Sequence, residues 1–349
     1  MIKQLELEIT TACNAACPQC SRNFYGGPQW PTVPNLSISL TWLQEKVPLE
    51  LLKNLELIRF CGTYGDPCMH PDLIDMIFWL KSVSTAKIVI STNGGMRSTK
   101  WWKNLAKVMD QNDRVIFGID GLHDTNHIYR RNVDFDKVID HAREFINNGG
   151  QAVWQFLVFE HNQHQTDQAQ KLSQELRFVD FIIKQTTRFV DKQHQFVDHV
   201  PILDNKKIFF LKLPSNQNLV NQGYEKYRTS KPDYTSVKID CIAKRLELLY
   251  IGADGYVFPC GFLADRLYGF EAENHLDYNR MQELFKEAGG AHMANLNYTS
   301  LANIINGPWF NAIHASWSNN NRLERCAHQC GVDNTLVTQI YSYMRGVTN

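Results

Sequence analysis

The sequence predicts an α/β protein: an open, curved (βα)6 sheet, which is a partial TIM-like barrel, followed by a small C-terminal α+β domain. Short apolar runs alternate with amphipathic helical patterns over the first 186 residues, as expected for right-handed βαβ units in a parallel sheet. Six such units are too few to close an eight-stranded barrel. After a stretch of poor periodicity, a strand–turn–strand pattern indicates the smaller second domain.

Six apolar runs are the predicted strands, namely residues 4–9, 55–60, 87–91, 114–119, 152–159 and 178–183. The helical patterns between them cover residues 40–46, 49–53, 71–84, 99–109, 134–148 and 165–176. Pro71 followed by Asp72 suits a first helical turn, and Gly149-Gly150 suits a helix end. Ligands in such folds bind at the carboxyl ends of the strands, so we expect the chemistry in the loops that follow them.

Three regions follow from this pattern: a core over residues 1–186, a connector over 187–235 and a C-terminal domain over 236–349. The connector is rich in Gln, His, Lys and Asn, and we expect its His194 and His199 to be solvated loop residues. In the C-terminal domain, residues 246–251 and 256–258 read as two strands joined by a turn at Ala253-Asp254-Gly255.

Composition excludes several classes of protein. Lys+Arg and Asp+Glu both number 36 in 349 residues, so no overall field favours nucleic acid or an anionic membrane. No apolar run approaches the ~20 residues that span a bilayer, and the first residues do not resemble a signal peptide. The nine cysteines therefore indicate a reducing cytoplasm, where they serve as metal ligands or free thiols rather than disulfides.

Cys13, Cys17 and Cys20 form a C-x3-C-x2-C loop directly after the first predicted strand. Iron–sulfur clusters are normally held by four thiolates, so three leave one iron open to a substrate or cofactor. A zinc knuckle is the alternative, but it needs a fourth ligand close by. The first histidine after Cys20 is His70, which lies beyond another predicted strand.

The cysteine loop resembles that of the radical S-adenosylmethionine (SAM) enzymes, where the open iron chelates SAM. The loop Cys61-Gly-Thr-Tyr-Gly-Asp-Pro67 resembles the "GGEP" loop of that superfamily, whose backbone receives the SAM ammonium. The resemblance implies contacts from Gly62, Tyr64, Gly65 and Asp66, with Asp66 where Glu is usual. The alternative is an ordinary Gly-Asp-Pro turn.

Two further strand ends fit the same family. Ser91 and Asn93 after the third strand, and Asp120 after the fourth, resemble the positions that contact the methionine and ribose of SAM. Arg130, in His-Ile-Tyr-Arg-Arg, resembles an arginine that binds the SAM carboxylate; a solvated basic pair with Arg131 is the alternative. Gln19 departs from the family, since an aromatic residue usually packs near the adenine at this position.

A second set of cysteines lies in the C-terminal domain. Cys241 and Cys260 flank the predicted hairpin, a short helix is expected around 301–317, and Cys326 and Cys330 follow on a turn. This order resembles the SPASM/twitch extensions of radical SAM enzymes, which bind auxiliary [4Fe-4S] clusters. Four thiols imply the reduced twitch form with one cluster, and a four-thiolate zinc site is the alternative.

Cys61 and Cys68 remain, and buried free cysteines usually behave as small hydrophobes. Cys61 ends the second strand at the catalytic edge, however. There it is a candidate catalytic residue that donates a hydrogen atom to a substrate radical, as the resemblance to some radical SAM epimerases implies.

The resemblance implies an enzyme that reductively cleaves SAM to a 5′-deoxyadenosyl radical and removes hydrogen from a substrate carbon. It implies SAM, a [4Fe-4S] cluster and an auxiliary cluster as cofactors, with flavodoxin or ferredoxin as electron donor. Peptides, protein side chains and small molecules are the substrate classes. Only three residues precede the first strand, so we expect no separate leader-peptide domain. Residues 24–37 form either a lid or a surface loop. The non-catalytic alternative is an electron-transfer or scaffold protein.

Overall fold

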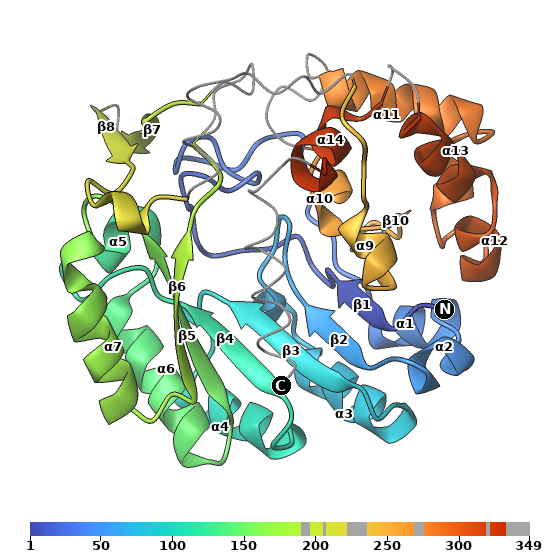
Figure 1. Cartoon of the computed structure of the whole chain (residues 1–349). Helices are drawn as coiled ribbons and strands as arrows, with labels where there is room; N and C mark the ends of the chain where they lie inside the picture. The colour runs from blue at the N-terminus through green and yellow to red at the C-terminus, as the bar shows by residue number, and fades with distance from the viewer. Residues whose placement is uncertain (190–195, 205–206, 222–235, 269–275, 319–321, 333–349) are drawn as a thin grey trace.

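An eight-stranded sheet forms the centre of the computed structural model, which describes residues 1–189, 196–204, 207–221, 236–268, 276–318 and 322–332 (Figure 1). Its order is β10-β9-β1-β2-β3-β4-β5-β6. The six predicted core strands are all present and pair in parallel, which confirms the predicted (βα)6 arrangement. Their bounds are β1 (Gln4–Leu7), β2 (Leu57–Phe60), β3 (Lys87–Thr92), β4 (Arg114–Gly118), β5 (Ala152–Val158) and β6 (Asp180–Gln185).

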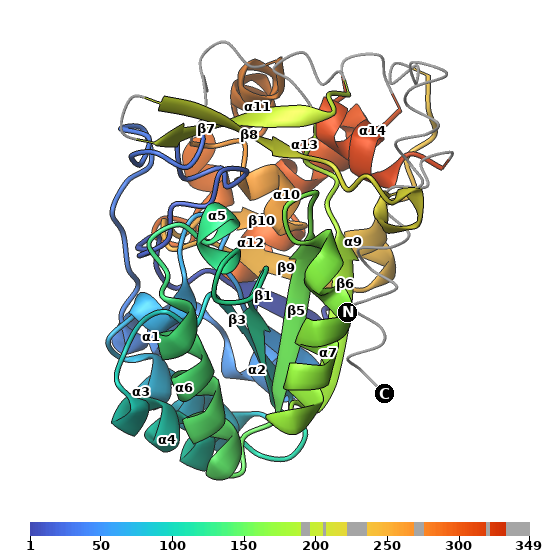
Figure 2. The same ribbon diagram turned by 90° about the vertical axis from the view of Figure 1, so that its left-hand side faces the viewer.

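Helices cover one face of this sheet, as Figures 1 and 2 show from two directions. The predicted six are α1 (Leu40–Lys46), α2 (Leu49–Lys53), α3 (Leu73–Val83), α4 (Thr99–Val108), α6 (Phe135–Asn147) and α7 (Thr166–Glu175). A short helix, α5 (Asn126–Tyr129), and two 3-10 turns, η1 (Pro67–Met69) and η2 (Gln163–Gln165), were not predicted. Asp134 caps α6 by accepting a hydrogen bond from the Lys137 amide at 2.9 Å.

The two faces of the sheet differ in chemistry because side chains alternate along each strand. Leu5 and Leu7 of β1 and Phe60 of β2 join the main core under the helices. On the opposite face, Leu57, Val89, Ile116 and Val153 form a small separate apolar layer. Toward the carboxyl ends this open face becomes polar, and there the site is built.

The C-terminal hairpin is part of the central sheet rather than of a separate layer. β9 (Leu248–Ile251) pairs in parallel with β1, and β10 (Val257–Phe258) pairs antiparallel with β9. All four residues of β9 are buried. The sheet is thus eight-stranded where six strands were expected, because β1 would otherwise expose an unpaired edge.

The connector contains more structure than its composition indicated. β7 (His199–Asp204) and β8 (Lys207–Lys212) form a separate two-stranded sheet, and η3 (Gln217–Leu219) follows. The sequence did not predict these strands, because apolar and polar residues do not alternate along β8. Its residues Ile208, Phe209 and Phe210 are consecutive, and each is more than half exposed. His199 lies in β7 with a half-exposed side chain beside Asp198, and His194 lies outside the described residues.

Short helices build the rest of the C-terminal region: α9 (Ile242–Arg245), α10 (Gly261–Ala264), α11 (Leu276–Glu287), α12 (Leu301–Ile305), α13 (Pro308–Ser316) and α14 (Glu324–Cys330), with a 3-10 turn, η5 (Ala291–Ala294). The one helix expected around 301–317 is two, since Pro308 starts a new helix after Gly307. The turn expected at Cys326 and Cys330 is the helix α14.

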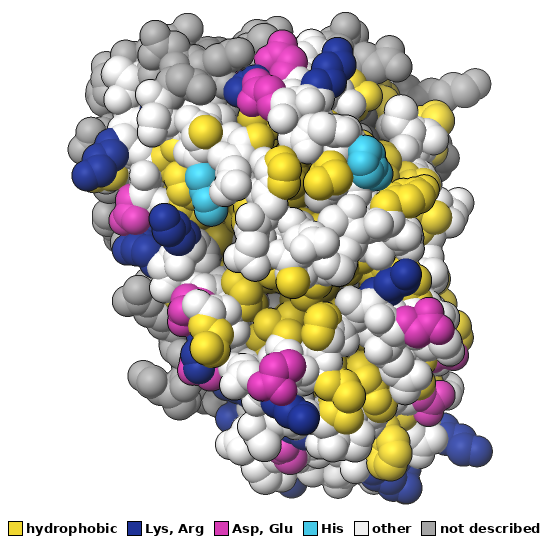
Figure 3. All heavy atoms as spheres, turned by 90° about the vertical axis from the view of Figure 1, so that its right-hand side faces the viewer, with side chains coloured by type: hydrophobic (Ala, Val, Ile, Leu, Met, Phe, Trp, Pro, Cys, Tyr) yellow, Lys and Arg dark blue, Asp and Glu magenta, His cyan; other side chains and the backbone are white. Residues whose placement is uncertain are grey.

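Acidic and basic side chains are interspersed on the face that Figure 3 shows, in keeping with the balanced charge of the chain. Among the described helices, none has the length and apolar character needed to cross a membrane.

Candidate functional site

The cysteine loop leaves β1 at the carboxyl edge of the sheet and is held from both sides. The Asp66 amide donates to the Ala12 carbonyl at 2.8 Å, and the Ala16 amide donates to the Arg131 carbonyl at 3.1 Å. Inside the loop, the Cys20 amide donates to the Cys17 carbonyl at 3.0 Å. The three predicted cysteines therefore share one short, braced loop.

Neutral and cationic donors face two of these thiols. Asn93 Nδ2 lies 3.7 Å from Cys13 Sγ, and Arg130 Nη1 lies 3.8 Å from Cys17 Sγ. Burial raises the pKa of Cys13 far above its ordinary value and that of Cys17 to about 11. The thiols therefore need a bound cation to ionise, as metal ligands do.

The donor set fits a cluster better than a single ion. Among the described residues, no three His, Cys, Asp or Glu side chains converge closely enough to ligate one metal ion. Zinc would draw its thiolates close together, at about 2.3 Å from one atom. The ligands of an iron–sulfur cluster instead bind separate irons, which suits more widely spaced thiols.

The loop after β2 needs glycine at two positions. A Cβ on Gly62 would lie 1.6 Å from the Gly65 carbonyl oxygen, and one on Gly65 would lie 1.8 Å from the Thr10 carbonyl oxygen. A side chain at Gly62 would distort the turn itself, and one at Gly65 would push the loop away from Thr10. The glycines predicted for close approach are thus required by the fold.

Asp66 and Tyr64 turn their side chains into the protein, and their expected place at the ligand stays a prediction. Asp66 is buried and accepts hydrogen bonds from the Thr92 hydroxyl at 2.9 Å and from the Asn93 and Cys68 amides at 2.8 and 2.9 Å. The Tyr64 hydroxyl donates to a C-terminal carbonyl, that of Ala264, at 3.1 Å. Asp66 therefore joins the loops after β2 and β3, and Tyr64 offers a ligand only its backbone.

Glu8, at the end of β1, is a site residue that sequence reasoning missed. It is 2% exposed, and one carboxylate oxygen accepts the Tyr64 and Gly65 amides at 2.6 and 2.9 Å. The other oxygen accepts the Tyr250 hydroxyl. The signal in the sequence was a carboxylate between the apolar residues Leu7 and Ile9, which needs hydrogen-bond partners once it is buried.

Burial raises the pKa of Glu8 from 4.5 to about 7, despite these donors. The pKa of Glu8 is therefore higher in the folded protein than in the unfolded chain. Its contribution to the free energy of unfolding is fully present below the unfolded pKa of 4.5 and is lost as the pH rises through 7. Between pH 6 and pH 8 we expect the unfolding free energy of the natural protein to fall by about 1.4 kcal/mol relative to Glu8→Gln. Anaerobic urea unfolding of both proteins at the two pH values measures this, and parallel pH dependences would contradict it.

Asp120 and Arg130 form a buried ion pair beside the cysteine loop, with Arg130 Nε 2.6 Å from Asp120 Oδ2. The other Asp120 oxygen accepts the Leu157 amide at 2.6 Å. A Cβ on Gly118 would lie 2.3 Å from Arg130 Nη2, so a side chain there would displace the guanidinium from its present position. Ser91 lies half-buried one strand away, paired in register with Ile116.

Arg131 turns to the opposite side from its neighbour. Its Nη2 lies 2.9 Å from Asp204 Oδ1 of β7, and its Nε donates to the Gly26 carbonyl at 2.9 Å. Leu203 of the same hairpin donates its amide to the Tyr25 carbonyl at 2.8 Å. Residues 24–37 are thereby tied to the β7–β8 hairpin.

Gln19, which stands where the family usually has an aromatic residue, makes two hydrogen bonds. Its amide nitrogen donates to the Arg188 carbonyl at 3.2 Å, and its oxygen lies 3.2 Å from the Thr186 hydroxyl. Lys184, which sequence reasoning also missed, lies on the open face of β6, where burial and Arg188 lower its pKa to about 8.

The two remaining cysteines differ in burial, and the role of Cys61 as a hydrogen donor stays a prediction. Cys68 is buried in the main core. Cys61 follows Arg59 by two residues and so shares the open face, where burial, Glu6 and Glu8 raise its thiol pKa well above the ordinary value.

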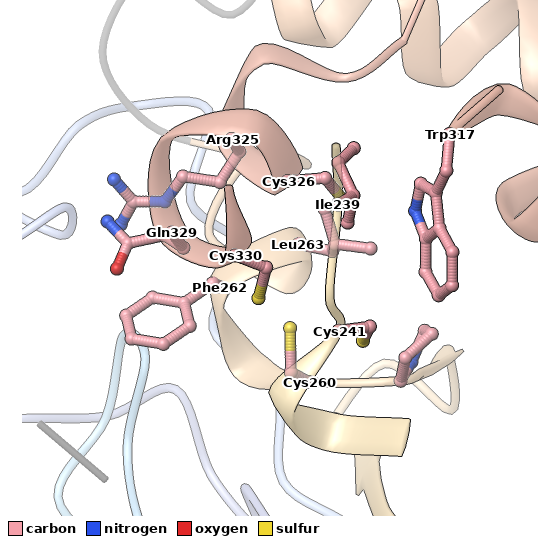
Figure 4. A pocket seen from close by; sticks show the side chains of 11 residues that line it. Ile239, Cys241, Cys260, Phe262, Leu263, Trp317, Arg325, Cys326, Gln329 and Cys330 are labelled. Carbon is pink, nitrogen blue, oxygen red and sulfur yellow. The ribbon is translucent and has the colours of Figure 1, made fainter. Parts of the chain in front are cut away.

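The four C-terminal thiols line one pocket, together with Phe262, Trp317 and Arg325 (Figure 4). Cys241 precedes α9, Cys260 precedes α10, and Cys326 and Cys330 lie one turn apart on α14. Cys260 and Cys330 point their sulfur atoms toward each other. A hydrogen bond from Cys330 lowers the pKa of Cys241 to about 7, whereas burial raises that of Cys260 to about 12. Four mostly protonated thiols that line one apolar pocket suit a cluster that displaces their protons.

Iron content tests both assignments. We expect the anaerobically reconstituted protein to hold close to eight irons per chain, four for each of two clusters. Elemental analysis of iron, zinc and sulfide measures this. Four irons with one zinc would assign the C-terminal thiols to a structural zinc site.

Comparisons with known proteins agree with this geometry. Residues 7–167 match the profile of the radical SAM superfamily, and residues 241–331 match that of the SPASM iron–sulfur cluster-binding domain. A curated relative, the tungsten-containing aldehyde ferredoxin oxidoreductase cofactor-modifying protein of Pyrococcus furiosus, is 32% identical over 121 residues, which are 35% of this chain and 32% of the relative. The chain therefore aligns with about a third of that relative's length.

Solved structures share the fold at low sequence identity. Streptococcus suis SuiB bound to the precursor peptide SuiA has a TM-score of 0.56 at 14% identity, covering 95% of this chain and 72% of that chain. SuiB bound to S-adenosylmethionine has a TM-score of 0.52 at 14% identity, covering 75% and 61%. The structure of anSMEcpe with bound AdoMet has a TM-score of 0.52 at 13% identity, covering 99% and 96%.

Proposed function

Because the chain belongs to the radical SAM superfamily and carries a SPASM domain, we propose that it cleaves SAM reductively and abstracts a hydrogen atom from a substrate carbon. One observation carries the proposal: three braced thiols lie beside a glycine loop at the carboxyl edge of the sheet. An electron carrier gains from four protein thiolates, so a three-thiol site favours an enzyme.

When bound, the cluster and SAM supply the one-electron chemistry that generates a 5′-deoxyadenosyl radical. The protein's part is to hold and orient them. Cys13, Cys17 and Cys20 would ligate three irons. The backbone of Gly62, Tyr64 and Gly65 would accept the SAM ammonium, while Ser91, Asn93 and Asp120 line the neighbouring strand ends.

Arg130 contributes positive charge to this site. It balances buried Asp120 and also faces the Cys17 thiol, so it would favour the thiolate form of that ligand as well as the carboxylate of SAM.

Arg130→Ala should therefore weaken SAM binding by about ten- to a hundred-fold, the loss expected for a charge-assisted contact. The matched control is Arg131→Ala, which should leave SAM affinity within about two-fold because Arg131 binds Asp204 and Gly26 instead. Equilibrium dialysis with labelled SAM compares the two. Equal losses would mean that the SAM anchor is misplaced.

We propose a peptide as the first substrate class to test, with small molecules as the alternative. The support is the shared fold with SuiB, whose structure holds a precursor peptide, over nearly the whole of this chain. Cys61, which shares the open face, is our candidate hydrogen donor to a substrate radical. We place the reaction in the cytoplasm, with flavodoxin or ferredoxin as electron donor.

The deciding experiment is anaerobic reconstitution with iron and sulfide, followed by dithionite and SAM. A radical SAM enzyme releases 5′-deoxyadenosine under these conditions even without its substrate. A protein that takes up both clusters but forms no 5′-deoxyadenosine would instead be an electron-transfer protein.

A further inference from the structure

The loop after β2, here residues 62–65 and called the β2 loop, is held by the C-terminal region at two places. The carboxylate of Glu8 lies between the β2 loop and Tyr250 of β9. Tyr64 reaches from the β2 loop to α10 and the residues after it. Neither connection takes part in the chemistry proposed above.

The first connection consists of buried hydrogen bonds. Glu8 Oε1 accepts the Tyr64 and Gly65 amides at 2.6 and 2.9 Å, and Glu8 Oε2 accepts the Tyr250 hydroxyl. Glu8 and Tyr250 are 2% and 1% exposed. Without the hydroxyl, water cannot easily take its place, and Glu8 would lose one of its three donors.

The second connection begins next to a C-terminal cysteine. The Tyr64 hydroxyl donates to the Ala264 carbonyl at 3.1 Å and lies 3.0 Å from the Tyr268 carbonyl. Ala264 ends α10, the helix that starts directly after Cys260. A Cβ on Gly261 would lie 3.3 Å from the Tyr250 ring and 3.4 Å from the Thr63 hydroxyl, so the segments pack closely.

These contacts set the direction of the loop's carbonyl groups. In a planar trans peptide the N–H and the preceding C=O point in opposite directions. Since the amides of Tyr64 and Gly65 point at Glu8, the carbonyls of Thr63 and Tyr64 point away from it. An ammonium group carries only donors, so outward carbonyls are what it requires.

We infer that Tyr250 and α10 act as positioning elements, which hold the β2 loop so that its carbonyls face the SAM ammonium and thereby couple the C-terminal region to SAM binding. The inference rests on the proposed function, because the ligand of the loop is taken to be SAM. It goes further in assigning to the C-terminal region a role in forming the SAM site.

The test compares Tyr250→Phe with Tyr256→Phe in the reconstituted full-length protein. Tyr256 lies on the same hairpin, but its ring packs against Phe285 at 5.6 Å between centroids. In Tyr250→Phe, hydrogen exchange of the Tyr64 and Gly65 amides should be at least about ten-fold faster, and SAM should bind about ten-fold more weakly. Both quantities should be unchanged in Tyr256→Phe, and the melting temperature of both variants should stay within a few degrees.

Two outcomes would overturn the inference. If hydrogen exchange of both amides is unchanged in Tyr250→Phe, Tyr250 does not hold the loop, regardless of the measured SAM affinity. Faster exchange with unaltered SAM affinity would show that the loop is held as described but does not bind SAM. A natural protein that binds no SAM would refute the proposed function directly, and the exchange result would still report on the loop.

Tyr64→Phe serves as a second variant, since it removes the contacts to Ala264 and Tyr268 without altering β9. It should also speed exchange of the Gly65 amide and weaken SAM binding. If Tyr250→Phe unfolds, seen as faster exchange throughout the sheet, Tyr64→Phe decides the question alone.

Discussion

Replacing Cys13, Cys17 and Cys20 together with Ala should abolish release of 5′-deoxyadenosine and lower the iron content by about four atoms per chain. SAM cleavage needs an iron with an open coordination position, and this loop offers three thiols. The C-terminal thiols form a separate pocket. We therefore expect them to retain their own iron in the triple variant.

Iron analysis and chromatographic detection of 5′-deoxyadenosine measure the two effects. The matched control is Cys68→Ala, which removes a buried thiol that belongs to neither set of predicted cluster ligands. It should keep close to eight irons and full SAM cleavage. A triple variant that still formed 5′-deoxyadenosine would show that other thiols hold the active cluster.

Cys326→Ala should lower the unfolding free energy by several kcal/mol. Ligation by Cys260 and Cys326 closes a loop of 66 residues, and closing a loop of this length with a cross-link contributes about 4 kcal/mol. The structure adds a local loss, because the neighbouring Arg325 lies 3.1 Å from buried Asp265. Disorder in α14 would expose this pair to water.

Melting temperature and limited proteolysis test this second effect. We expect the variant to be cleaved readily within residues 236–349 while the (βα)6 core resists, with the Cys68→Ala protein as control. SAM cleavage should persist only weakly, because Tyr250 and α10, which support the β2 loop, lie in the destabilised region. A Cys326→Ala protein of full stability that loses only substrate turnover would place the auxiliary cluster in substrate binding or electron transfer.

The sequence alone determined the core strands, the helices between them and the order of the two cysteine sets. These features are local: apolar residues repeat with the period of a strand or helix, and motif residues follow the strands directly. The sequence also favoured Arg130 over Arg131 as the arginine that binds the SAM carboxylate, and this assignment stays a prediction. The structure places that residue beside Cys17 and turns its neighbour toward β7.

Only the tertiary structure decided how distant segments use these residues. Pairing of β9 with β1 is not encoded by any local period, since paired residues such as Gln4 and Leu248 are 244 positions apart. The oxygens of the Asp66 side chain accept hydrogen bonds from the Thr92 hydroxyl and the Asn93 amide, which come close only when β2 and β3 lie side by side. The sequence did not identify Glu8 as a site residue, because the role of a carboxylate depends on its hydrogen-bond partners. Those partners, the β2 loop and Tyr250, meet it only in the folded sheet, where burial makes each unsatisfied hydrogen bond costly.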